Sequence, residues 1–180
     1  MDFKGHYRLM AVYNRRMNQQ VFQAAALLSA EQLNQDVGTY FSSVLGTLNH
    51  ILVGDLLWLA RFSDHSDQYV TLDKLKQFPF PTALNQLLYD DLSSLFETRK
   101  AVDEIIEQWL ESDTEYSHFQ QDLTYQNSRG VVSVRNFAEL VAHLFNHQTH
   151  HRGQASALLF QLGVDVGVTD FLMDIPDKYE

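Results

Sequence analysis

The chain has 180 residues, of which 45% are hydrophobic and 20% charged, so we expect one globular domain, residues 1–180, that buries a core of its own. It contains no cysteine, which excludes disulfides, thiolate metal sites and a cysteine nucleophile. The formal net charge of −10 argues against nucleic acid as a partner, because phosphate binding depends on a basic surface.

The most apolar stretch is HILVGDLLWLARF, residues 50–62. Asp55 and Arg61 interrupt it well short of the roughly 20 apolar residues that a membrane span requires. The first twenty residues lack the apolar centre of a signal peptide. We therefore expect a cytoplasmic protein that has no membrane partner.

Hydrophobic residues recur at helical spacing in four long segments. The first two cover about residues 3–28 and 42–62, and the second is apolar on most sides. A third covers about residues 82–110, and the last begins near 134–137 and ends near 163. Between the last two, residues 119–134 alternate apolar and polar side chains around the turn sequence NSRG and predict a short hairpin.

The third helix is predicted to begin after the interruption made by Pro79 and Pro81. Thr82 is a suitable N-cap, and Leu84 and Leu88 continue an apolar face at helical spacing. Together, the segments predict an all-α protein: an antiparallel four-helix bundle with a short hairpin before its last helix.

Residues 143–151 read HLFNHQTHH, so four of the eight histidines fall within nine residues. On a helix that turns about 100° per residue, His151 lies in the middle of the apolar stripe and His147 lies about 40° to one side. His143 borders this pair, and His150 is expected at the edge or in solvent. Because side chains at i and i+4 converge, His147 and His151 form an inward-facing pair suited to one metal ion.

The second helix contains one histidine, His50, with Gly46 and Gly54 four residues away on either side. A glycine inside a helix costs about 1 kcal/mol relative to alanine, so this pair indicates that space is needed near His50. The space would serve a ligand or a close approach between helices. His50 is therefore the expected third member of a site with His147 and His151.

Three histidine ligands leave at least one coordination position open, which is typical of catalytic metal sites. Imidazole suits several divalent transition metals. His143, Asn146 and Gln154 are candidates for contacts behind the ligands. The alternative is a set of core histidines that are hydrogen-bonded to carbonyls or carboxylates and bind no metal.

No catalytic residue is assigned from the sequence. Asp55 is a candidate general base only through its closeness to His50, and a polar partner within its helix is the more ordinary role. Arg152 projects off the apolar stripe, which predicts a surface or interface role as readily as a functional one. Glu115 and His118 give a single Glu-x-x-His match in an expected loop, whereas a di-iron site needs two on helices.

Four segments of the chain resemble the DinB/YfiT-like metalloenzymes, which are unrelated to the DNA polymerase that shares the DinB name. The segments are GTLNHILVGDLLWLARF, YDDLSSLFETRKAVD, NHQTHHRGQ and LGVDVGVTDFL. The resemblance implies a four-helix bundle, often a homodimer, with a divalent metal held by His50, His147 and His151. Zinc or nickel is the expected metal, with iron, manganese or copper as alternatives.

The resemblance also implies chemistry with a low-molecular-weight thiol, as a thiol-dependent S-transferase or isomerase acting on a small molecule. A protein without cysteine requires an external thiol for such chemistry. A metal-dependent hydrolase is the nearest alternative. A non-catalytic, metal-binding stress-response dimer is another.

Overall fold

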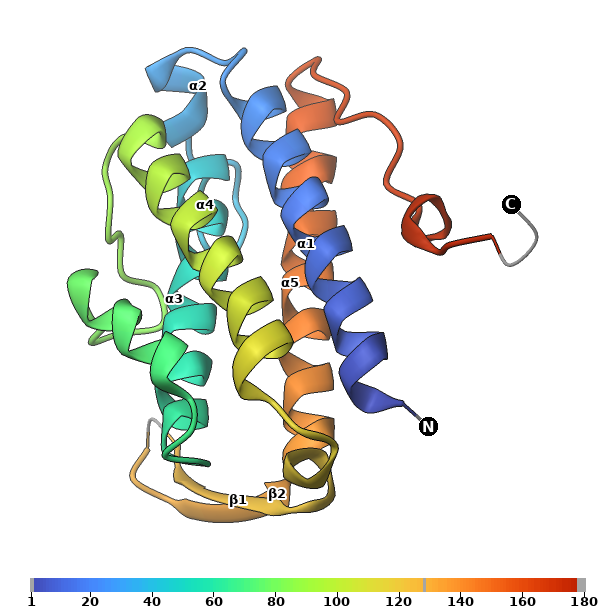
Figure 1. Ribbon diagram of the computed structural model, residues 1–180. Coiled ribbons are helices and arrows are strands. Elements are labelled where there is room, and N and C mark those ends of the chain that lie inside the picture. The colour runs from blue at the N-terminus through green and yellow to red at the C-terminus, as the bar shows by residue number, and fades with distance from the viewer. Residues whose placement is uncertain (1, 128, 178–180) are drawn as a thin grey trace.

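Four long helices form the framework of the structure, a computed structural model that describes residues 2–127 and 129–177. These helices lie side by side in Figure 1 and are α1 (Phe3–Ala25), α3 (Val44–Ser63), α4 (Leu92–Gln108) and α5 (Phe137–Gln161). The shorter helical elements are α2 (Ala30–Asn34), η1 (Val70–Gln77), the π-helical turn η2 (Trp109–Asp113), η3 (Tyr116–Gln120) and η4 (Phe171–Asp174). The chain is therefore mostly helical, as the sequence predicts.

The helix directions differ in one respect from the predicted antiparallel bundle. Helix α3 runs opposite to α5, and α1 runs opposite to α4, but α1 and α5 run in the same direction (Figure 1). The Tyr7 hydroxyl near the start of α1 donates to the Ala138 carbonyl near the start of α5, at 2.6 Å. The long connection 64–91, which includes η1, returns the chain to the end where α3 began. Consequently α3 and α4 also share a direction.

The third long helix begins ten residues later than predicted, at Leu92 rather than after Thr82. Asp91 caps it, because its Oδ1 accepts from the Ser94 backbone N–H at 2.8 Å. The Asn49 side chain from α3 accepts from the backbone N–H groups of Leu88 and Tyr89, at 2.8 and 3.0 Å. This tertiary contact satisfies backbone donors that a helix would otherwise have used.

The predicted hairpin is present at one end of the helices (Figure 1). Strands β1 (Asp122–Gln126) and β2 (Val132–Asn136) pair antiparallel, with Tyr125 opposite Ser133. The Asn127 side chain accepts from the backbone N–H groups of Arg129 and Val131 and so stabilises the turn. Asn136 then caps α5, so the hairpin leads directly into the helix that carries the histidines.

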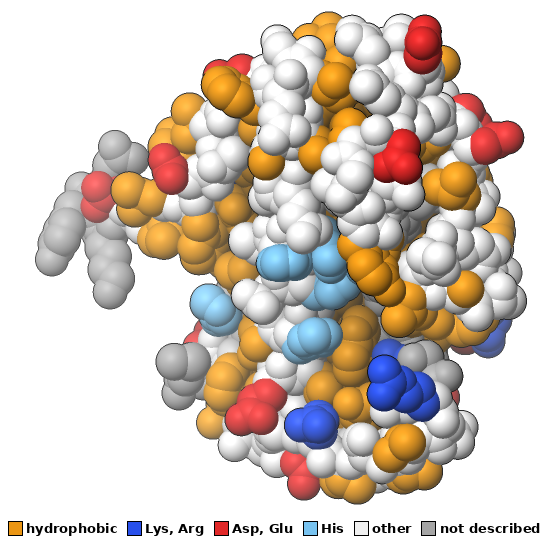
Figure 2. Space-filling view, turned by 180° about the vertical axis from the view of Figure 1, so that it is seen from behind, with side chains coloured by type: hydrophobic (Ala, Val, Ile, Leu, Met, Phe, Trp, Pro, Cys, Tyr) orange, Lys and Arg blue, Asp and Glu red, His pale blue; other side chains and the backbone are white. Residues whose placement is uncertain are grey.

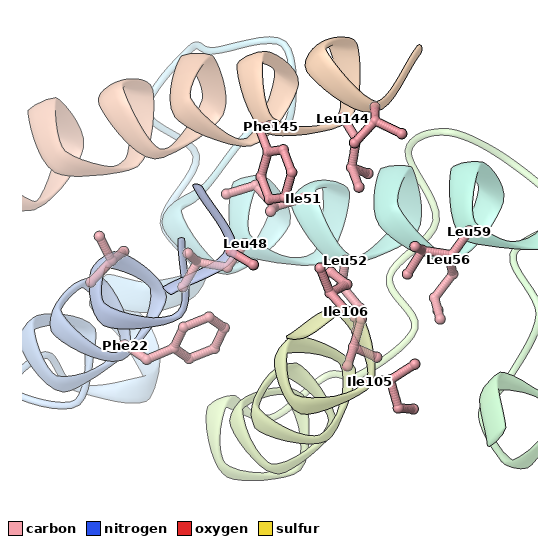
Figure 3. Packing of buried hydrophobic residues seen from close by; sticks show 14 of the residues in the cluster. Phe22, Leu48, Ile51, Leu52, Leu56, Leu59, Ile105, Ile106, Leu144 and Phe145 are labelled. Atoms are coloured by element: carbon pink, nitrogen blue, oxygen red, sulfur yellow. The ribbon is translucent and has the colours of Figure 1, made fainter. Parts of the chain in front are cut away.

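The core lies between the four long helices. Figure 3 shows Leu48 and Leu52 of α3 beside Ile106 of α4 and Phe145 of α5, and all four are almost completely buried. Helix α3 is covered on several sides, as its apolar composition predicts.

The C-terminal segment packs back against α1 through polar and aromatic contacts. The Phe171 ring lies 5.1 Å from the Tyr13 ring, and the Arg16 guanidinium pairs with the Asp174 carboxylate at 2.6 Å. Within the described part of the chain, every helix is too short or too polar to cross a bilayer.

Candidate metal centre

Three histidines from two helices converge on one point. The Nε2 atom of His50 in α3 lies 3.1 Å from Nε2 of His147 and 3.2 Å from Nε2 of His151, both in α5. One ring nitrogen from each residue lies within 4.8 Å of the other two. Figure 2 shows the histidine side chains gathered on one face of the molecule. We refer to His50, His147 and His151 as the histidine triad.

Two glycines in α3 make this approach sterically feasible. A Cβ atom at Gly54 would lie 2.5 Å from Cε1 and 3.0 Å from Nδ1 of His147. A Cβ atom at Gly46 would overlap the backbone carbonyl oxygen of Phe41. The prediction that the glycines provide space is therefore confirmed, at Gly54 for the partner histidine and at Gly46 for the segment that leads into α3.

Oxygen acceptors orient two of the three imidazoles. The His50 Nδ1 atom lies 2.7 Å from the carbonyl oxygen of Leu84, which can only accept, so the proton of neutral His50 is on Nδ1. The His151 Nδ1 atom lies 2.8 Å from Oε1 of Gln154, which favours the same tautomer. Both Nε2 atoms therefore present lone pairs to the shared point. Such orienting contacts are typical of histidines that bind metals.

The triad favours neutral imidazoles. Burial, followed by the charges that His151 and His50 would carry, lowers the pKa of His147 to about 3. Burial also lowers the pKa of His50, against the opposing effect of the Leu84 carbonyl. Burial lowers the pKa of His151 too, although the Gln154 amide opposes it. Neutral imidazole is the form that coordinates a cation.

The spacing of the nitrogens fits a bound metal ion. Two imidazole nitrogens about 2.0–2.1 Å from a tetrahedral zinc ion lie roughly 3.3 Å apart. The measured separations from His50 are 3.1 and 3.2 Å. Without a cation, the lone pairs of His50 and His151 would face each other across 3.2 Å with no proton between them. The three histidines could therefore hold a divalent metal ion.

Of the other residues predicted to lie near the triad, some contact it and others do not. Gln154 contacts His151 directly, and the His143 ring lies 6.1 Å from that of His147. Asn146 is exposed and lines a different cavity, beside His6, so it makes no contact behind the triad. His150 is exposed, as predicted. Its ring lies 4.7 Å from that of His151.

Arg152 and Asp55 belong to the core rather than to the triad. The surface role considered for Arg152 is wrong, because the residue is 3% exposed and donates to Asn18 and Gln148 at 3.3 and 3.1 Å. Asp55 is completely buried and pairs with Arg99 through Oδ2, so it lies in the ion-paired core rather than at the triad as a general base would.

The sequence interpretation missed two parts of the site. The Phe41 ring stacks on the His50 ring with 3.8 Å between centroids, and Leu84 orients His50 through its backbone. Phe41 lies in the irregular segment before α3, and Leu84 lies in a segment that its hydrophobic spacing wrongly assigned to the third helix, so periodicity predicted neither contact. A pocket of about 270 Å³ also adjoins the triad. Its lining includes His50, Trp58, Arg61, Tyr125, His143 and His147.

Comparison with known proteins identifies the family. The model of the DinB family matches residues 1–178. The chain belongs to the DinB family. It is similar to Protein DinB of Bacillus subtilis (strain 168), with 27% identity over 161 residues that cover 88% of this chain and 87% of the relative. No solved structure matches the chain. Family membership and the histidine triad together are compatible with metal binding.

Proposed function

We propose that this DinB-family protein binds one divalent transition-metal ion through His50, His147 and His151 and uses it in thiol chemistry on a small molecule. The convergence of the three Nε2 atoms carries the proposal. Zinc or nickel is the metal we expect. The four-helix bundle expected for the family would hold the ligands on two of its helices, and we expect the working unit to be a homodimer.

A divalent metal at this site would lower the pKa of a thiol that occupies its open position and so supply a nucleophilic thiolate. The Leu84 carbonyl and the Gln154 amide would hold the Nε2 lone pairs of His50 and His151 toward that ion. The adjoining pocket offers room for a small organic molecule on one side of the triad. It provides apolar surface at Leu57 and Trp58.

The proposed reaction is transfer of a thiol sulfur to an electrophilic carbon. The sulfur forms a C–S bond, the leaving group departs with the electron pair of the broken bond, and the thiol proton passes to solvent. Since the chain has no cysteine, both the thiol and the electrophile must come from solution. In an isomerisation, the same thiol would add to the substrate and leave again.

Cobalt-loaded protein offers a direct test. We expect 2-mercaptoethanol to produce a sulfur-to-cobalt absorption band and the loaded protein to accelerate its reaction with an aryl halide. His147→Ala should abolish both, and Gln161→Ala, at an exposed position on α5, should leave both unchanged. A cobalt spectrum that thiols do not alter would overturn thiol chemistry. If the thiol produces the cobalt band but the protein does not accelerate its reaction with any of a range of electrophiles, the result would favour the non-catalytic, metal-binding role.

A further inference from the structure

Arg61 contributes a positive charge to the pocket beside the triad. It lies on the same helix as His50, and the pocket brings it together with Trp58 of α3 and Tyr125 of β1. The guanidinium carbon lies 4.7 Å from the centre of the Trp58 ring and 5.6 Å from that of the Tyr125 ring. The two rings therefore hold the guanidinium in place and leave its N–H donors free for another partner.

Arg61 has no carboxylate partner within residues 2–127 and 129–177, although the protein carries ten more acidic than basic charges. Arg16 and Arg99, in contrast, pair with Asp174 and Asp55. The side chain of Arg61 is half-buried, and burial lowers its pKa. A half-buried guanidinium that has no carboxylate partner among the described residues can bind an anion from solution through its N–H donors.

Among the residues that the structure describes, the pocket lining contains no aspartate or glutamate. An anion that enters the pocket therefore meets the guanidinium without a competing carboxylate. Arginine binds carboxylates through two parallel N–H···O bonds, and such charge-assisted bonds are about twice as strong as neutral ones.

We propose that Arg61 binds a carboxylate group of the small molecule whose sulfur or electrophilic carbon reacts at the histidine triad. This inference rests on the proposed function and adds the chemical class of the substrate. The apolar side chains of Leu57 and Trp58 would contact the part of the molecule between its two ends. The substrate is then an organic acid with an apolar middle rather than a neutral or cationic compound.

The helix geometry limits the length of this substrate. A helix rises about 1.5 Å per residue, so the step from residue 50 to residue 61 separates the two Cα atoms by roughly 16 Å. The side chains of Arg61 and His147 line the same pocket, and a helical side chain leans toward the N-terminus of its helix, so the ligand must span less than the separation of the Cα atoms. A ligand therefore needs several carbons between its sulfur and its carboxylate, and 6-mercaptohexanoate, which has five methylene groups between them, is a suitable probe.

A matched pair of thiols tests the proposal. The cobalt-loaded protein is titrated with 6-mercaptohexanoate and with 6-mercaptohexanol, which differ only in the carboxylate. Cobalt absorption reports the sulfur, and the ligand-dependent change in fluorescence reports Trp58, because Trp58 lines the pocket whereas the only other tryptophan, Trp109, is fully buried. We expect about tenfold tighter binding of the acid, corresponding to about 1.4 kcal/mol.

Arg61→Gln should remove this preference and change the dissociation constant of the alcohol by less than twofold. Arg135→Gln is the matched control, because it removes the same charge from an exposed position outside the pocket, and it should keep the preference. Equal binding of the two thiols by the parent protein, or a preference that persists in Arg61→Gln, would overturn the role of Arg61.

The test separates this inference from the proposed function. If neither thiol alters the cobalt spectrum, thiol chemistry fails, and hexanoate is compared with hexanol by Trp58 fluorescence in the same proteins. A preference for hexanoate that disappears in Arg61→Gln would still support the carboxylate site. Absence of any preference would overturn it.

Discussion

Two clusters of polar side chains lie within the helices of this protein, and they differ in what completes them. The buried ion cluster contains two arginines and two aspartates, so its formal charges cancel; its members are Asp55, Arg99, Asp103 and Arg152. The histidine triad has three nitrogens that face one another and no acidic partner. The charges of the first cluster are balanced by the chain itself, whereas the second could be completed by a cation from solution.

The ion cluster joins all four long helices. Asp55 of α3 and Asp103 of α4 flank Arg99, and Asn18 of α1 donates to Asp103 at 3.0 Å. Asn18 also accepts from Arg152 of α5 at 3.3 Å. Burial acts to lower the pKa of Arg99, but Asp103 and Asp55 outweigh it and raise that pKa, so the guanidinium stays charged. We therefore expect the ion cluster to contribute to stability and the histidine triad to serve the proposed function.

Removing one partner from the ion cluster should have the largest effect on stability. Arg99→Ala leaves two buried carboxylates without their guanidinium, and we expect the free energy of unfolding to fall by about 3–5 kcal/mol. Urea denaturation measures this change. Lys100→Ala, which removes an exposed ion pair with Glu97 from the same helix, should change it by less than about 1 kcal/mol. Similar losses in the two variants would contradict the difference between buried and exposed pairs.

The triad should respond to acid when no metal is bound. The pKa of His147 is about 3 in the folded state, against an ordinary value of 6.5. A folded-state pKa below the unfolded one means that its contribution to stability is complete above pH 6.5 and is lost as the pH falls toward 3. The urea midpoint of metal-free protein should therefore decrease between pH 7.5 and pH 5, and decrease less in His147→Gln. Parallel pH profiles for the two proteins would contradict this assignment.

Gly54 should affect the triad without changing a ligand. The Cβ atom of Gly54→Ala would displace the His147 ring, and we expect metal affinity to fall about 10–100-fold, as for other residues that position metal ligands. Competition with a chromophoric chelator measures the affinity. Gly153→Ala on α5 is the control, because its added Cβ meets no atom within 4 Å. Equal affinities in the two variants would mean that the close approach of Gly54 and His147 is unimportant.

Gln154 should have the smallest effect. Gln154→Ala removes the acceptor on His151 Nδ1, and we expect about a tenfold loss of metal affinity, at the lower end of the range for such contacts. Gln161→Ala, at another exposed position of α5, should bind metal like the parent protein. An unchanged affinity in Gln154→Ala would show that the ring of His151 is oriented by its other contacts.

The histidine triad could be predicted from the sequence because its signals are local. The i, i+4 spacing of His147 and His151 and the glycines beside His50 depend only on helix periodicity. The ion cluster could not be predicted in this way, since Arg152 donates to Asn18 of α1, which in turn donates to Asp103 of α4, and these helices are far apart in sequence. An arginine off the apolar stripe therefore appeared to belong to the surface.

The difference between local signals and contacts between distant segments also explains the errors in the predicted fold. Helix α4 begins at Leu92 rather than near Thr82, where it was predicted to begin. The side chain of Asn49 in α3 accepts hydrogen bonds from the backbone N–H groups of Leu88 and Tyr89, which are therefore not used in a helix. Helices α1 and α5 run in the same direction because the long connection 64–91 returns the chain to the end where α3 began. The hydrophobic pattern of the sequence does not predict the path of this connection. Element type was predictable for the long helices, whereas their start points and directions depended on contacts between segments.

The most direct test of the metal assignment is the metal content of tag-free protein, measured by mass spectrometry beside His50→Ala, His147→Ala and His151→Ala variants that remain folded. We expect close to one divalent ion per chain in the parent protein and a large loss in each variant. Negligible metal in all four proteins, persisting after zinc and nickel are offered, would contradict the account and leave the triad as three hydrogen-bonded core histidines.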